Sequence, residues 1–183
     1  FVGLTIGIGG VLAAGVIAVS LHELSDNPAR WGWTWSTMPD AFGEAPSTEG
    51  LVEDERVESA GMYQVSQVAL DGSSMGAFAM VPLKGPLTFT GLDGRLPAGP
   101  GEVAVGEQTM SDLGVSIGGT VEATAPDGTS ARTLTVVGTA VLPPTEDSNI
   151  DVGAVLTPDG LAAFDRSDLL ESPVLTYPAG ADV

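Results

Sequence analysis

An uncharged apolar run at residues 1–21 constrains the architecture of this chain more than any other feature. An α-helix rises about 1.5 Å per residue, so a helix of this length extends roughly 30 Å, the thickness of a bilayer's hydrocarbon core. Thr5 and Ser20 are its only polar side chains, and they leave no water-facing stripe of the kind a soluble surface helix carries. We therefore expect a transmembrane helix with a short juxtamembrane extension over residues 1–27.

Small residues recur four apart along this run, a spacing that lets two membrane helices approach closely. The predicted packing face consists of Gly3, Gly7, Gly10, Ala14 and Ala18. A cleaved signal peptide is the alternative interpretation, but the run lacks a basic leader and a small-residue cleavage site. The letters GIGGVL also half-match a dinucleotide-binding fingerprint, yet Leu12 stands where its third Gly or Ala belongs.

Charge indicates on which side of the membrane the remainder lies. Glu23, Asp26 and Asp40 follow the apolar run with Arg30 as the only nearby cation, whereas cytoplasmic loops are enriched in Lys and Arg. We therefore expect the chain after about residue 27 to be extracytoplasmic in a cell-membrane protein. The whole chain carries 24 acidic against 6 basic side chains, a formal net charge of −18 that repels phosphate backbones and excludes nucleic acid as a partner.

The remaining residues, 28–183, are expected to form one α+β domain that is mixed, strand-rich and interspersed with short helices. Turn chemistry predicts two hairpins, with strands at 63–70 and 75–82 around DGSS and at 121–125 and 131–141 around PDGT. Other expected strands are 102–105, 151–156 and 174–177, and expected helices are 48–54, 107–113 and 158–164. Residues 91–102 are dense in Gly and Pro and are expected to be loop. Because the chain opens abruptly on Phe1 and stops shortly after a strand, we expect a truncated helix and a truncated domain.

All three tryptophans lie within the stretch WGWTWS. Trp31, Trp33 and Trp35 alternate, so an extended strand would place them on one face. This pattern favours a strand that packs an aromatic face onto a core and braces the domain against the preceding helix. An interfacial aromatic belt and a ligand-stacking site are the alternatives.

Motifs that could carry chemistry are weak. GSSMG places Ser74 in a nucleophile-elbow pattern, but the only His in the chain, His22, precedes it, and nothing in the spacing brings Lys84 near. EDSNID places Asp147, Asn149 and Asp151 as in a calcium loop, yet Val152 and Pro158 occupy positions that require Gly and Glu. The acidic run at 53–55 fits a solvated helix face, and His22 fits a polar end of the apolar helix better than a ligand. The sequence therefore predicts no catalytic residue, no metal site and no cofactor.

Two stretches together resemble a known family. LPAGPGEVAVGEQTMSDLGVSIGGTVEA (residues 96–123) and LTVVGTAVLP (residues 134–143) are similar to the periplasmic core domain of FtsX-like, MacB-type ABC transporter permeases, particularly actinobacterial ones. WGWTWS and LTYPAGADV resemble further segments of that domain, whereas Gly119 stands where relatives often carry Asp.

This resemblance implies a permease subunit whose extracytoplasmic domain is driven by a separate cytoplasmic ABC ATPase. It further implies a second permease half or subunit, lipid around residues 1–21, and movement of a lipid, lipoprotein or peptide, or regulation of a cell-envelope partner. The chain itself contains no nucleotide-binding G-x-x-x-x-G-K-[ST] motif. A membrane-anchored binding or adhesion module without an ATPase is the alternative function.

Overall fold

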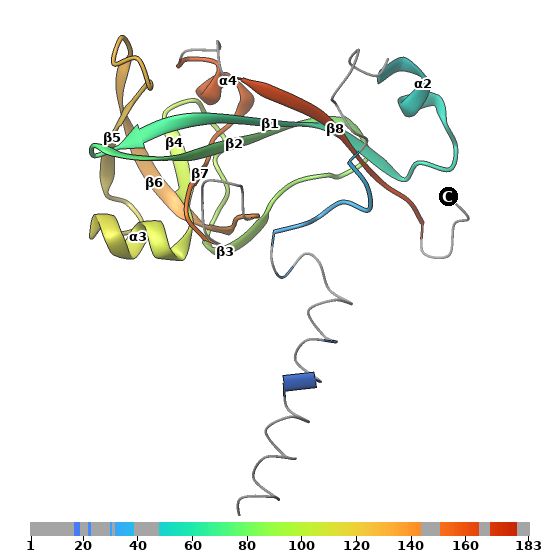
Figure 1. Cartoon of the computed structure of the whole chain (residues 1–183), viewed down its shortest axis with the longest axis horizontal. Coiled ribbons are helices and arrows are strands. Elements are labelled where there is room, and N and C mark those ends of the chain that lie inside the picture. Colours follow the sequence, from blue (N-terminus) through green and yellow to red (C-terminus); the bar gives the residue numbers. More distant parts are fainter. Residues whose placement is uncertain are drawn as a thin grey trace, which may run out of the picture.

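The computed structural model describes residues 17–18, 22, 30, 32–38, 48–143, 151–164 and 169–178. Within these ranges the chain has the predicted mixed, strand-rich α+β fold (Figure 1). The described elements are α2 (Thr48–Glu53), β1 (Ser59–Leu70), β2 (Ser73–Lys84), β3 (Thr90–Gly94), β4 (Glu102–Val105), α3 (Glu107–Leu113), β5 (Thr120–Thr124), β6 (Ala131–Val141), β7 (Ala154–Val155), α4 (Pro158–Leu161) and β8 (Leu170–Thr176).

Most of the predicted transmembrane helix lies outside the described residues. In the described part of the chain, no helix is both long and apolar enough to cross a membrane. Of the predicted packing face, Ala18 is helical and exposed, whereas Gly3, Gly7, Gly10 and Ala14 are outside the described ranges. The helix, its packing face and the boundary at residue 27 stay predictions.

Six strands close into a ring. β1 pairs with β2, β2 with β7, β7 with β4, β4 with β6, β6 with β5, and β5 returns to β1. The β2–β7 and β4–β6 pairs are parallel and the other four are antiparallel. Closure matters because it removes the open sheet edges that otherwise invite association with other chains.

Two of the three long strands, β1 and β6, each share one edge between two partners. β1 pairs with β8 through residues 59–65 and with β5 at Ala69 and Leu70. β6 pairs with β5 through residues 131–135 and with β3 through residues 138–141. The expectation that residues 91–102 are all loop was therefore wrong at its start. β3 forms there because β6 extends beyond β5 and leaves backbone groups that need partners.

Alternation along the strands separates two apolar cores. The inner core fills the ring with side chains from all six of its strands, and Leu161 and Phe164 pack onto it from α4 and the turn that follows. On β2, Ala77 and Ala79 face this inner core, whereas Phe78 and Met80 face an outer core. The outer core also takes residues from β1, β4, β6, β7 and β8, and Trp35 completes it.

Turn chemistry explains why both hairpins were predicted correctly. Asp71 and Gly72 have φ of 46° and 84°, the left-handed conformation that a two-residue hairpin turn requires. Gly128 has φ of 72° in the turn between β5 and β6, and Gly114 ends α3 at φ 64°. The strands at 102–105 and 131–141 and the helix at 107–113 have the predicted bounds.

Candidate functional site: the junction at residues 32–38

Residues 32–38, here called the strap, run beside β8 on their way to the sheet (Figure 1). Ser36 N–H and Thr37 N–H both donate to the Leu175 carbonyl, at 2.8 and 3.2 Å. Leu175 N–H donates in return to the Thr37 carbonyl at 3.0 Å, which makes an isolated antiparallel bridge. The strap is thus held by the outer edge of β8, opposite the edge that pairs with β1.

Trp35 inserts into the outer core and is only 3% exposed. Its ring centroid lies 5.0 Å from that of Trp33 and 5.1 Å from that of Tyr63. Tyr63 continues the contact to Phe78 at 5.9 Å and to Phe89 at 6.2 Å. An unbroken row of aromatic rings therefore connects the strap to β1 and β2. Burial in this row raises the pKa of the Tyr63 hydroxyl above its usual range.

Gly32 provides a third anchor. Its φ is +89°, and an added Cβ would lie 2.5 Å from the nitrogen of Pro143 and 2.7 Å from the carbonyl carbon of Leu142. Only glycine allows the backbone to approach the end of β6 this closely in this conformation. The strap consequently contacts three separate places on the sheet, at β8, at the β1 aromatic row and just beyond β6.

The structure confirms part of the prediction for the tryptophan stretch. Trp35 packs into a core as predicted, and Trp33 lies against it, half-buried. The expectation of a strand was wrong for residues 33–36, because the left-handed turn at Gly32 and a bend at residues 35–36 leave only Thr37 in a bridge. Trp31 lies outside the described residues, and the brace formed by all three tryptophans stays a prediction.

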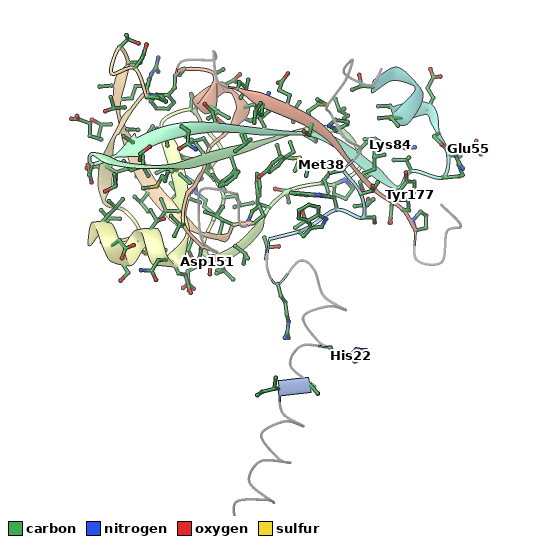
Figure 2. All side chains as sticks on the ribbon, viewed as in Figure 1. His22, Met38, Glu55, Lys84, Asp151 and Tyr177 are labelled. Carbon is green, nitrogen blue, oxygen red and sulfur yellow. The ribbon has the colours of Figure 1, made fainter. Side chains whose placement is uncertain are left out.

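The structure separates the serine and lysine that the sequence singled out. Ser74 is exposed at the start of β2, and Lys84 ends the same strand, a separation of roughly 33 Å at about 3.3 Å per residue. Lys84 Nζ instead donates to the Asp54 carbonyl at 2.9 Å. His22 lies outside the sheet domain (Figure 2). The side-chain positions therefore do not assemble a nucleophile with a base at Ser74.

The other acidic motifs have structural roles where they are described. Asp151 adopts φ 62°, and its carbonyl accepts a long hydrogen bond of 3.4 Å from Thr109 N–H. Asp147 and Asn149 lie outside the described residues. Asp54, at the end of α2, pairs with Arg56 at 2.7 Å, and this bond lowers the Asp54 pKa to about 2. The described residues contain no group of three or more His, Cys, Asp or Glu that could hold a metal ion.

A small cavity of about 90 Å³ lies beside the outer core. It is lined by Met80, Thr88, Phe89, Leu96, Pro97, Val155, Leu156, Thr157 and Pro158. Sites for drug-sized ligands typically measure about 300–1,000 Å³. This cavity is therefore too small to indicate a small-molecule site.

The loop that borders this cavity is closed by an ion pair with a testable pH signature. Arg95 donates to both carboxylate oxygens of Glu102, at 2.7 Å to Oε2, and Ala98 N–H adds a third bond at 2.8 Å. These bonds favour the ionised carboxylate and lower the Glu102 pKa to about 2. Because the folded-state pKa is depressed, the pair's contribution is complete above about pH 4.5 and is lost as the pH falls toward 2.

We predict that an NMR titration of the Glu102 side-chain carboxyl gives a midpoint near 2 in the folded protein. In Arg95→Met the midpoint should rise toward the ordinary value of 4.5, because the largest cause of the shift is removed. Arg132→Met on β6 is the matched control and should leave the midpoint unchanged. A wild-type midpoint near 4.5 would contradict the pairing.

The sequence located the strap but not its receiving surface. Tyr63 and Phe78 were assigned to strands without a role, and Phe89 and Leu175 were not singled out. The available signal was the presence of two aromatic residues, Tyr63 and Phe78, in one predicted hairpin. In the β1–β2 register Tyr63 pairs with Met80 and Phe78 pairs with Val65, so the two aromatic residues lie diagonally across the two strands.

Comparison with known proteins gives a structural likeness. No protein-family model and no curated protein matches the chain. A crystal structure described as "a domain of a putative Permease protein from Porphyromonas gingivalis" is similar at 15% sequence identity with a TM-score of 0.46. The match covers 76% of this chain and 69% of that one.

Proposed function

We propose that this chain is the extracytoplasmic portion of an ABC transporter permease subunit, with part of the preceding membrane helix. In this proposal a cytoplasmic ABC ATPase supplies the energy and a second permease half or subunit completes the membrane unit. The domain acts by movement, on a lipid, lipoprotein or peptide or on a cell-envelope partner. The chain itself makes and breaks no covalent bond.

The docking of the strap is the observation that carries this proposal. The strap is the described segment that directly follows the apolar run and its extension, and it is fixed to the sheet by hydrogen bonds, by a buried indole and by a close backbone approach. A displacement of the chain before residue 32 would therefore pull on the sheet rather than on a free linker. The sequence resemblance at residues 96–123 and 134–143 supports the same function independently.

The strand pairing explains how one anchor could move the entire domain. β8 is paired with β1 over seven residue pairs, and β1 is paired with β2 over nearly its full length. The Gly32 contact lies just beyond β6, which pairs with β3, β4 and β5. The strap thus contacts β1 and the residues just beyond β6, and β1 and β6 together pair with every other strand except β7. Force applied at the strap is distributed over the ring.

Affinity purification of the full-length protein from its native membrane tests this function. We expect an ABC ATPase to co-purify and the isolated complex to hydrolyse ATP. Thr120→Val, at an exposed position on β5, should retain the ATPase and is the matched control. Recovery of the protein without any ATPase would favour the membrane-anchored adhesion module and contradict the proposal.

A further inference from the structure

The strap contains a disproportionate share of the domain's unpaired polar groups. Among the described residues, four buried side-chain atoms have no hydrogen-bond partner: Thr34 Oγ1, Trp35 Nε1, Ser66 Oγ and Asp151 Oδ1. The first two belong to consecutive strap residues. A buried hydroxyl or N–H without a partner loses its hydrogen bonds to water and gains none in exchange. The lost hydration of these two groups therefore makes the free energy of strap docking less favourable.

The backbone attachment of the strap is also narrow. Every backbone–backbone hydrogen bond between the strap and β8 ends on Leu175, and Tyr177 N–H, just beyond β8, adds one long bond of 3.4 Å to Ser36 Oγ, whereas β1 and β8 pair over seven residues. Residues two apart on a strand face the same edge, so Pro173 lies on the outer edge with Leu175. Proline has no N–H to donate, so the ladder cannot extend past this position. Docking of the strap is therefore stabilised mainly by burial of the Trp35 indole and by a few backbone hydrogen bonds. The loss of hydration at Thr34 Oγ1 and Trp35 Nε1 opposes it.

We propose that the strap is a releasable clamp with a docked and a released state. On release, Trp35 leaves the outer core and Leu175 loses its outer hydrogen bonds, while the six-strand ring stays closed. The ring survives because its inner core contains no strap residue. We further infer that the docked strap transmits movement of the membrane segment to the sheet domain and that the released strap does not, and this role rests on the proposed function. The existence of the released state does not.

Amide hydrogen exchange on the full chain, without any ATPase, tests the clamp. Leu175 and Val174 are neighbours on β8 whose N–H groups face opposite edges, toward the strap and toward β1 respectively. After correction for intrinsic rates, the Leu175 amide should exchange at least about tenfold faster than the Val174 amide, because release opens only the outer edge. Equal protection of the two amides would overturn the proposal, since the strap would then open only with the domain.

A substitution that removes one unpaired hydroxyl sharpens the test. Thr34→Val keeps the side-chain shape and should slow Leu175 exchange about three- to tenfold while leaving Val174 unchanged. Thr120→Val, at an exposed position on β5, is the matched control and should alter neither rate. Thr34→Val that fails to slow Leu175 exchange would contradict the role given to the unpaired group.

Tryptophan fluorescence gives a second readout, because Trp31, Trp33 and Trp35 are the only tryptophans and none lies elsewhere in the domain. We expect Thr34→Val to reduce quenching by acrylamide relative to the wild-type chain, and increased or unchanged quenching would count against the clamp. Failure of an ATPase to co-purify would remove the proposed function and leave this result standing.

Discussion

Gly106→Ala is expected to destabilise the domain by at least about 3 kcal/mol, close to the upper limit for overpacking, and to lower its melting temperature by roughly 10 °C. A Cβ at this position would lie 1.9 Å from the Asp151 carbonyl oxygen and 2.4 Å from its carbon. Both atoms belong to the backbone, so no side-chain rotation relieves the clash. The φ of Gly106 is −65°, which any residue adopts, so the entire cost is steric.

The effect should be specific to the contact between the end of β4 and the residue that leads into β7. Gly106 N–H donates to the Gly153 carbonyl at 3.1 Å, so the clash should also weaken the pairing of β4 with β7. Gly101→Ala, whose Cβ would meet no atom within 4 Å, is the matched control and should change stability by less than about 0.5 kcal/mol. Chemical denaturation of both variants measures the difference. Similar midpoints would show that the backbones do not meet as described.

Trp35→Ala is expected to lower the free energy of unfolding by about 3 kcal/mol, at the low end of the usual range for a buried aromatic residue. The side chain is 3% exposed and touches two further rings, so truncation removes both apolar burial and aromatic contacts. The loss in the free energy of unfolding cannot exceed the free energy of strap docking, because a released strap makes no contacts that the substitution could remove.

Trp33→Ala is the internal control for this substitution. Trp33 is half-buried at the edge of the same core, so its truncation should cost clearly less than that of Trp35. Urea denaturation followed by far-ultraviolet circular dichroism makes the comparison without depending on the tryptophans. A larger loss of unfolding free energy for Trp33→Ala than for Trp35→Ala would contradict the assignment of Trp35 as the main anchor of the strap.

Local sequence signals were sufficient for the hairpins and short helices but not for the ring. Asp71-Gly72 fixes the β1–β2 turn, and Gly114 ends α3, because these conformations depend on a few adjacent residues. The parallel pairings β2–β7 and β4–β6 join segments that are distant in sequence, and β7 has only two residues. Their partners are selected by core packing, which no local pattern reports.

The junction was predictable in part for the same reason. Alternation of the tryptophans correctly indicated a buried aromatic contact at Trp35, since burial follows from side-chain type. It failed to predict the path of the backbone, which is set by the contact of Gly32 with residues beyond β6. The receiving residues Tyr63, Phe89 and Leu175 come from three distant segments, and only the fold brings them together.

In the proposed function, the strap carries movement from the membrane side into the sheet domain. Because these 183 residues contain no cysteine, a cysteine introduced at exposed Leu92 of β3 is unique among them, and the purified protein can be labelled there with an environment-sensitive fluorophore before the permease–ATPase complex is assembled. We predict that trapping the ATPase with ATP and vanadate changes the fluorophore emission. A flexible Gly-Ser insertion after Arg30 should abolish this change. The same insertion in the Asp127–Gly128 turn is the control and should preserve it. An ATP-dependent change that survives the insertion after Arg30 would contradict the claim.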